Sequence, residues 1–406
     1  MTHLAPHPWR YAALYFPMGL MIGYPSVALG YLSSRAGLPV SAAAAMVGSA
    51  FFAHAFKFLW APLADYSLSR KAWYRIAIAV MCVVIVALTV TPMHESTIPL
   101  LSMIVLGGNL AGTFVAFATE GLMAHNAGPG GRGRASGWFQ SGNQFGQTAG
   151  GGLGLWFTKH LPELWMAGVA LAVILVACSL ALSGLEEPPV THRGASVGDR
   201  ARDAWRELAA VLRSRAGRIG LLLCILPIGT GSAQFLFGSL GPEWHASSDA
   251  VSFALGIGGG IAIVAGCMTG GLLASRMPTA RAYATACAIS ACAALLLVAS
   301  PRNTLGYTAS TLTYTFALGL CSTTLTGMVL DVIGTRAAAT KINVFFAMNT
   351  MFGLAMLRAD GVAHDRWGTN GMLWFEFLLS AACLALFVVL VRRIRGTPAP
   401  ETSPTA

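Results

Sequence analysis

The sequence predicts an all-α membrane protein with 12 transmembrane helices in two pseudo-symmetric six-helix halves. Three observations lead to this fold class. Of the 406 residues, 55% are hydrophobic and only 10% are charged, whereas a soluble domain carries about 25% charged residues. Apolar runs of about 20 residues, long enough to cross a bilayer as a helix, recur along the whole chain. A long basic segment separates the first six runs from the last six.

The expected spans follow from the apolar runs in order. The first six lie at 9–32, 41–64, 75–92, 98–123, 135–158 and 164–183, and the last six at 218–240, 249–274, 279–298, 304–330, 338–359 and 371–391. The 46 glycines suit helices that pack closely in lipid, because a missing side chain lets two backbones approach. The first run is too long for a cleavable signal peptide and has no small-residue cleavage site after it.

These runs divide the chain into four regions. We expect an N-terminal half at 1–183, a cytoplasmic linker at 184–217, a C-terminal half at 218–394 and a disordered tail at 395–406. In the linker, "DRARDAWRELAAVLRSR" places Trp205, Leu208 and Leu212 at helical spacing among arginines. It predicts an amphipathic helix that lies on the membrane surface or, equally well, a plain solvated linker helix.

A comparison of the chain with itself supports a duplication. An offset of 210 residues aligns Pro17 with Pro227 and Gly19 with Gly229 in the first and seventh spans, and it also pairs the second span with the eighth. The offset predicts two parallel halves with a substrate site between them near the midplane of the membrane.

The basic residues indicate orientation rather than a nucleic-acid partner. With both termini inside, 20 of the 26 Lys and Arg residues fall in cytoplasmic segments, 5 fall outside and 1 lies within a span. This is the distribution that the positive-inside rule describes. The eight cysteines all fall inside expected spans, without metal-ligand spacing, so we expect them to be packing residues and expect no metal site.

The stretch "GSAFFAHAFKFLWAPLADYSLSRKAW" resembles the second span and following loop of the AmpG-like peptide/acetyl-coenzyme A/drug transporter branch of the major facilitator superfamily. "KFLWAP" carries most of this resemblance, and "PLADYSLSRK" is similar to the general loop motif of the superfamily. Pro62 departs from the motif glycine, and the basic pair Arg70-Lys71 comes one residue late. "ATEGLMAHNAGPGGRGRASGW" and "LDVIGTRAAATKINVF" are similar to the same branch.

Lys57 lies inside the second expected span, about 16 residues from its start. A cation there costs about 2.5–3.5 kcal/mol on insertion scales, so we expect it to face a partner or a cavity. Three interpretations remain open: a cavity cation that pairs with a carboxylate or receives an anionic substrate, a purely structural ion pair, or a side chain that extends to the headgroups.

A second set of charges is expected at the cytoplasmic ends of the spans, where Glu120 and Asp331 occupy equivalent places in the two halves. Cations follow both, beginning with Arg132 in the first half. Such groups can close the cytoplasmic side through salt bridges and helix N-termini, can carry a proton, or can be solvated interfacial charges. The residues assigned to gating or proton coupling are Asp65, Arg70, Glu120, Arg134, Asp331, Arg336 and Lys341.

Polar side chains share helical faces in several spans, most clearly in the fifth, where four amides follow i, i+3, i+4, i+7 spacing. Such a face is costly in lipid unless it meets water, substrate or another helix. Gly-rich bends mark the first and seventh spans. The expected substrate-cavity residues are Lys57, Tyr24, Asn109, Thr113, Gln140, Asn143, Gln144, Gln147, Gln234, Thr311, Tyr314 and Thr315.

The outer loop "RADGVAHDRWG" concentrates Arg358, Asp360, Asp365 and Arg366, which we expect to form salt-bridged interfacial structure or an outer latch. Glu376 falls close to the outer surface and receives no role.

The sequence contains no phosphate-binding loop and no catalytic set, so we expect neither an ATP-driven pump nor an enzyme, and no cofactor. The resemblance implies a secondary active transporter of the bacterial inner membrane, with both termini cytoplasmic, that moves a muropeptide- or siderophore-like solute by alternating access. We expect protons as the coupling ion, in a symporter that is a monomer. The alternatives are a drug or metabolite exporter and a non-transporting membrane receptor on the same fold.

Overall fold

The computed structural model describes residues 7–29, 52–54, 56–187, 197–226, 229, 231–333 and 338–396, together with residues 32, 33, 36, 46, 49 and 50. Every regular element within these ranges is helical. Seven of these helices or helical runs are long and apolar enough to cross a membrane. α7, with 29 residues, is not among the seven, although it has the length, because glycines and amides interrupt its apolar character.

The N-terminal group of helices matches the first six expected spans closely where it is described. Its α-helices are α1 (Trp9–Gly23), α4 (Ala61–Tyr66), α5 (Arg70–Val90), α6 (Ile98–Asn126), α7 (Arg132–His160) and α8 (Leu164–Cys178). Its short helices are η1 (Tyr24–Leu29), η2 (Lys57–Leu59), η3 (Glu95–Thr97), η4 (Pro129–Gly131) and η5 (Ser179–Leu182).

The C-terminal group follows the linker helix α9 (Val197–Arg213). Its α-helices are α10 (Arg215–Ile225), α11 (Phe237–Leu240), α12 (Ser248–Leu255), α13 (Ile257–Arg276), α14 (Thr279–Ala299), α15 (Thr304–Ile333) and α16 (Ala338–Gly396). Its short helices are η6 (Ser232–Leu236) and η7 (Gly241–Trp244). α16 joins the last two expected spans, and Gly368 breaks it with φ 67° and ψ −176°. We call the segments before and after Gly368 the first and second arms.

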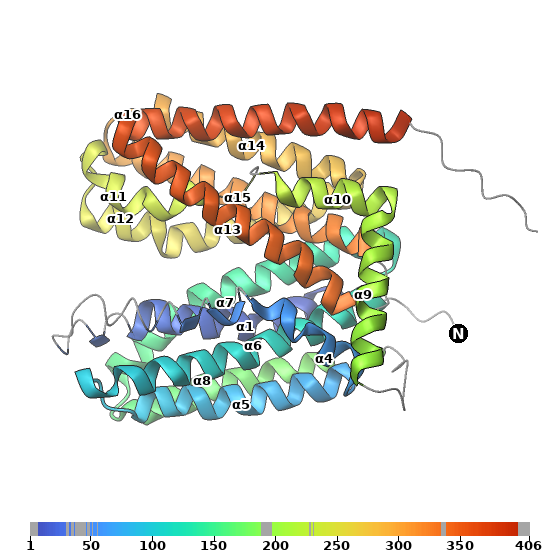
Figure 1. Ribbon diagram of the computed structural model, residues 1–406. Coiled ribbons are helices and arrows are strands. Elements are labelled where there is room, and N and C mark those ends of the chain that lie inside the picture. Colours follow the sequence, from blue (N-terminus) through green and yellow to red (C-terminus); the bar gives the residue numbers. More distant parts are fainter. Residues whose placement is uncertain are drawn as a thin grey trace, which may run out of the picture.

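Figure 1 shows how these helices are arranged. The N-terminal group fills the lower part of the view and the C-terminal group the upper part, with most helices running side by side. α9 runs across their ends at one side of the bundle. α1 begins and α16 ends on that same side, which we call the α9 end. α9 lies in the segment where a linker helix was expected, with Leu208 buried and Trp205 exposed.

Three expected spans, 9–32, 41–64 and 218–240, are not continuous α-helices where they are described; the breaks in the first and seventh lie at their Gly-rich bends, and the break in the second was not expected. The second span changes to a 3-10 turn at Lys57–Leu59 before α4 begins. Pro62 explains this break, because a proline ring clashes with the carbonyl group four residues earlier. The first span ends in the π-helix Tyr24–Leu29. In the seventh, Gly229 and Gly231 adopt positive φ values that favour glycine.

α1 and α7 pack backbone against backbone. A Cβ atom built on Gly142, Gly146 or Gly150 of α7 would lie 2.1–2.5 Å from a carbonyl oxygen of α1. These glycines follow each other at four-residue spacing, so they form one smooth strip along α7. Strips of small residues let membrane helices approach closely enough for direct backbone contact.

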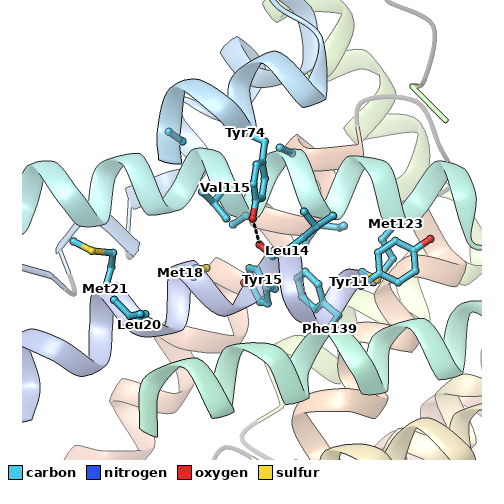
Figure 2. Close-up of a cluster of buried hydrophobic side chains, with 14 of the residues drawn as sticks. Tyr11, Leu14, Tyr15, Met18, Leu20, Met21, Tyr74, Val115, Met123 and Phe139 are labelled. Atoms are coloured by element: carbon cyan, nitrogen blue, oxygen red, sulfur yellow. Dashed lines mark hydrogen bonds between the residues drawn. The ribbon is translucent and has the colours of Figure 1, made fainter. Parts of the chain in front are cut away.

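The core of the N-terminal group surrounds α1 on its other sides. Figure 2 shows Tyr74 of α5 pointing toward α1, where its hydroxyl group donates a 3.1 Å hydrogen bond to the Leu14 carbonyl oxygen. The Tyr15 ring stacks on Phe139 of α7 with centroids 3.7 Å apart. α1 is therefore held by aromatic packing as well as by the glycine strip.

We predict that Gly146→Ala destabilises the protein. Its Cβ would lie 2.2 Å from the Phe16 carbonyl oxygen, so α1 must shift, which typically costs about 1–3 kcal/mol. Gly152→Ala is the matched control on the same helix, because no atom lies within 4 Å of the added carbon. Thermal unfolding of the purified protein should show a lower midpoint for Gly146→Ala alone. Equal midpoints for the two variants would contradict the close contact.

Candidate functional site

A buried ion pair lies inside the bundle. Lys57 Nζ from η2 lies 3.8 Å from Glu120 Oε1 of α6. The two residues expose only 7% and 0% of their surface. Removing two charges from water is costly, and the pair is maintained only where further contacts support it.

The C-terminal group supplies those further contacts. Asn343, on the first arm of α16, donates a 3.0 Å hydrogen bond to Glu120 Oε2. The Phe346 ring lies 5.5 Å from Lys57 Nζ, close enough for a cation–π interaction. The ion pair therefore lies where the two groups of helices touch.

The position of Glu120 corrects one expectation. We expected it at the interfacial end of its span, with the following arginines as partners. Instead, Glu120 precedes the last residue of α6, Asn126, by six residues, which is about 9 Å at 1.5 Å per residue. It is fully buried and paired with Lys57, and Arg132 pairs elsewhere. A carboxylate at this depth needs a cation at the same depth, and Lys57 provides it.

Neighbouring polar groups connect the second span to α6 and α1. His54 Nε2 lies 3.1 Å from Asn109 Oδ1, and the Asn109 amide donates to the Met21 carbonyl oxygen at 3.3 Å. Trp60 Nε1 donates to Thr113 Oγ1 at 2.9 Å. Asn109 and Thr113 are fully buried, so in this conformation they bind protein groups.

Contacts between the two groups of helices gather at the α9 end. Arg132 Nη1, at the start of α7, lies 3.1 Å from Asp331 Oδ1 of α15. Thr279 of α14 donates to the other oxygen of Asp331 at 2.6 Å. Close by, a Cβ built on Gly137 would lie 3.0 Å from Gly271 Cα, so α7 and α13 also touch through their backbones. The two groups of helices therefore touch at this end of the bundle.

The other expected gate residues occupy different environments. Arg70 is buried and donates to the Ala64 carbonyl oxygen at 2.6 Å. Lys341 donates to the Ile333 carbonyl oxygen at 3.1 Å, and Arg134 is exposed. The side chain of Asp65 and all of Arg336 lie outside the described residues.

Sequence reasoning missed Glu187. Its carboxylate accepts hydrogen bonds from the backbone N–H groups of Arg70 and Lys71, at the start of α5. Negative charge is favourable at a helix N-terminus, so this contact anchors the segment after α8 to α5. The signal was present as the acidic pair in "GLEEPP", the only acidic residues in that stretch.

The four amides of α7 divide into two sets. Gln140 donates a 2.7 Å hydrogen bond to Thr326 of α15, which is a further contact between the two groups. Gln147 donates to Gln144 at 3.4 Å, and Asn143 Oδ1 is buried without a hydrogen-bond partner. All four amide residues are half-buried.

The remaining expected cavity residues lie apart from the ion pair. Tyr24 is fully buried against Gly154, and Gln234 is half-buried in η6. Thr311 and Thr315 of α15 are buried, and each hydroxyl oxygen has no hydrogen-bond partner. Tyr314 donates to a residue that we had given no role, Glu376, at 2.5 Å.

An apolar cavity of about 480 Å³ lies elsewhere, between α1, α7, α8 and α13. Its walls include Phe16, Trp138, Phe145, Val264 and Met268. It offers almost no hydrogen-bonding groups, so it does not suit a polar solute. The polar cavity expected from the sequence stays a prediction.

Three solved membrane-transport structures share the overall fold. The human organic anion transporter TETRAN is 16% identical, with a TM-score of 0.68 over 94% of this chain and 98% of that chain. The E. coli fucose:proton symporter FucP is 14% identical, with a TM-score of 0.69 over 98% of this chain and 100% of that chain. The proton:xylose symporter XylE is 14% identical, with a TM-score of 0.66 over 95% of this chain and 96% of that chain.

No curated protein sequence matches this chain. At the level of families, the Major Facilitator Superfamily matches residues 11–359, which is most of the chain. Its members are membrane transporters and not enzymes, in agreement with the helical fold. The chain therefore belongs to the major facilitator superfamily.

Proposed function

We propose that this transporter moves a polar organic solute across the bacterial inner membrane by alternating access, coupled to protons. The observation that carries the proposal is the buried ion pair of Lys57 and Glu120, held by Asn343 from the other group of helices. If the first arm of α16 moves away from α6, the Asn343–Glu120 hydrogen bond must break. Once it breaks, Glu120 has fewer hydrogen-bond donors. Binding of a proton to Glu120, or of a charged cargo to the ion pair, then compensates for the lost contact.

The contacts at the α9 end support a cytoplasmic gate. The positive-inside rule assigns this end to the cytoplasm, because 14 of the 22 arginines lie in α9, at the starts of α1, α5, α7 and α10, and at the end of α16. The Arg132–Asp331 salt bridge joins the two groups here. An exposed salt bridge contributes only about 0–1 kcal/mol, which suits a contact that opens in every transport cycle. Alternating access also requires the two halves, 1–183 and 218–394, to move as units.

The cargo class follows from a resemblance in sequence and from the chemistry of Lys57. The resemblance of "KFLWAP" and its surroundings to the AmpG-like branch favours a muropeptide- or siderophore-like solute. Both classes carry anionic groups that a lysine ammonium can bind. Two structures of the same fold are proton symporters of sugars, and a third transports organic anions. An exporter of drugs or metabolites is the second candidate, and the apolar cavity favours it.

Uptake into proteoliposomes tests coupling and cargo together. Labelled muropeptide fragments, ferric siderophores, simple sugars and an apolar drug are each supplied with and without a pH gradient. We expect accumulation of a polar anionic solute only with the gradient, and its loss on adding a protonophore. Equal accumulation with and without the pH gradient would contradict proton coupling. Preference for the apolar drug would favour the exporter.

Substitutions of the ion pair test its role. Lys57→Met removes the cation that pairs with the buried Glu120, which costs about 3–5 kcal/mol of stability. Adding Glu120→Gln removes that charge, so the double variant should regain most of the stability but still transport at least about tenfold less than the native protein. Thermal unfolding and uptake are measured on the same preparations. Lys159→Met, at the exposed end of α7, is the control. Normal uptake by the double variant would remove the ion pair from the mechanism.

The gate has a separate test. Asp331→Asn removes the charge that binds Arg132, which should raise the population open at the α9 end by up to about fivefold, the equivalent of 1 kcal/mol. In a chain without native cysteines, Gln147→Cys should then react faster with an impermeant thiol reagent added on the cytoplasmic side. Asp249→Asn, on the exposed first turn of α12, is the control. Unchanged labelling would contradict the gate.

A further inference from the structure

Two buried carboxyl groups lie on the two arms of α16. Asp360 precedes the break at Gly368 by eight residues, and Glu376 follows it by eight. At 1.5 Å per residue, both lie about 12 Å from the bend, so they share one depth in the bundle. Figure 1 shows that this bend lies at the side opposite the α9 end. Asp360 is 0% exposed and Glu376 is 5% exposed, which corrects the expectation of an interfacial loop and a surface glutamate.

Each carboxyl group has one hydrogen-bond donor, from a different element. Tyr314 of α15 donates to Glu376 Oε1 at 2.5 Å, and Ser232 of η6 donates to Asp360 Oδ2 at 2.5 Å. The second oxygens, Glu376 Oε2 and Asp360 Oδ1, are buried without a hydrogen-bond partner. An ionised carboxylate has about four acceptor sites. Both groups are therefore poorly satisfied as anions.

No cation within the described residues pairs with either carboxyl group. The basic residues of α10 and α14, Arg215, Arg218 and Arg281, lie at the α9 end of those helices, and α15 has none. α15 supplies Tyr314, which is the hydrogen-bond donor to Glu376. The side chain of Arg358 lies outside the described residues.

A titratable side chain connects the pair to the surface. His364 follows Asp360 by one helical turn, so the two share a face of the first arm. Its Nε2 atom lies 4.0 Å from Glu243 Oε1, and both side chains are partly exposed. Thr369 of the second arm also donates to Glu243. A proton from the outer solution thus meets titratable groups before it reaches Asp360.

We propose that Asp360 and Glu376 form a proton-binding site in the C-terminal group, loaded from the end opposite α9. Two carboxylates in apolar surroundings, with no cation paired to them among the described residues, cannot both stay ionised, since burial and mutual repulsion each favour the neutral form. Among the described residues, no third His, Cys, Asp or Glu side chain joins the two to make a metal-binding group, so the pair lacks the ligand set of a hard divalent cation. The coupling role of the site rests on the proposed transport function, but proton binding by the pair does not.

The site can be tested without a substrate. Infrared difference spectra of the purified full-length protein in lipid nanodiscs, between acid and alkaline pH, report the C=O band of buried protonated carboxyl groups. We expect this band in the native protein, a loss of about half or more of it in Glu376→Gln or Asp360→Asn, and a frequency shift in Tyr314→Phe. Asp365→Asn is the matched control, because its side chain is 86% exposed on the same arm.

The outcomes separate this site from the transport proposal. A titrating band that survives in Asp360→Asn, Glu376→Gln and Tyr314→Phe would overturn the site and leave transport untouched. Loss of the band when sodium is added at constant pH would overturn the proposal that the site binds a proton.

Once a cargo is identified, Glu376→Gln should lower uphill accumulation at least about tenfold while exchange of cargo across the membrane continues. Equal loss of accumulation and exchange would overturn the coupling role. Where a variant does not fold, Ser232→Ala replaces it.

Discussion

The cost of burying charge in apolar surroundings governs the interior of this transporter. Only a few ionisable side chains lie deep in the bundle, and each has a specific arrangement around it. Lys57 and Glu120 neutralise each other, and Asn343 completes the set from another part of the chain. The exposed pair of Arg132 and Asp331 bears no such cost, since water still reaches it. The buried pair of Lys57 and Glu120, with Asn343, therefore holds the contact between the two groups. The pair of Arg132 and Asp331 can break and re-form at lower cost.

The two groups of helices handle buried charge differently, although their spans suggest a duplicated unit. The N-terminal group contains a cation paired with its carboxylate, and the C-terminal group contains two buried carboxyl groups with which no cation among the described residues pairs. A net-neutral pair can exchange partners with a charged cargo. A pair of acids can gain and lose protons without a change of partner. This asymmetry would let one protein handle a solute and a coupling ion at separate places.

Most of the helices could be predicted from the sequence, because the length of an apolar run sets where a spanning helix begins and ends. α5, α6 and α14 lie within a few residues of their expected ranges. The break at Lys57–Leu59 was missed, although Pro62 signals it. The pairing of Glu120 with Lys57 and Asn343 could not be predicted, because 63 and 223 residues separate these partners along the chain and a single sequence carries no record of contact. Asp360 was placed in a surface loop because its neighbours Asp365 and Arg366 are charged.

The glycine strip of α7 has a mechanical consequence. Because α1 and α7 meet through their backbones, neither can rotate or slide without a collision of main-chain atoms. The two helices therefore move as one rigid unit. The conformational change of the transport cycle must occur at other contacts. Gly137 and Gly271 supply a second smooth contact, between α7 and α13, close to the α9 end. A close backbone contact at one end of a rigid helix pair can act as a pivot, about which the opposite ends of the two groups swing apart.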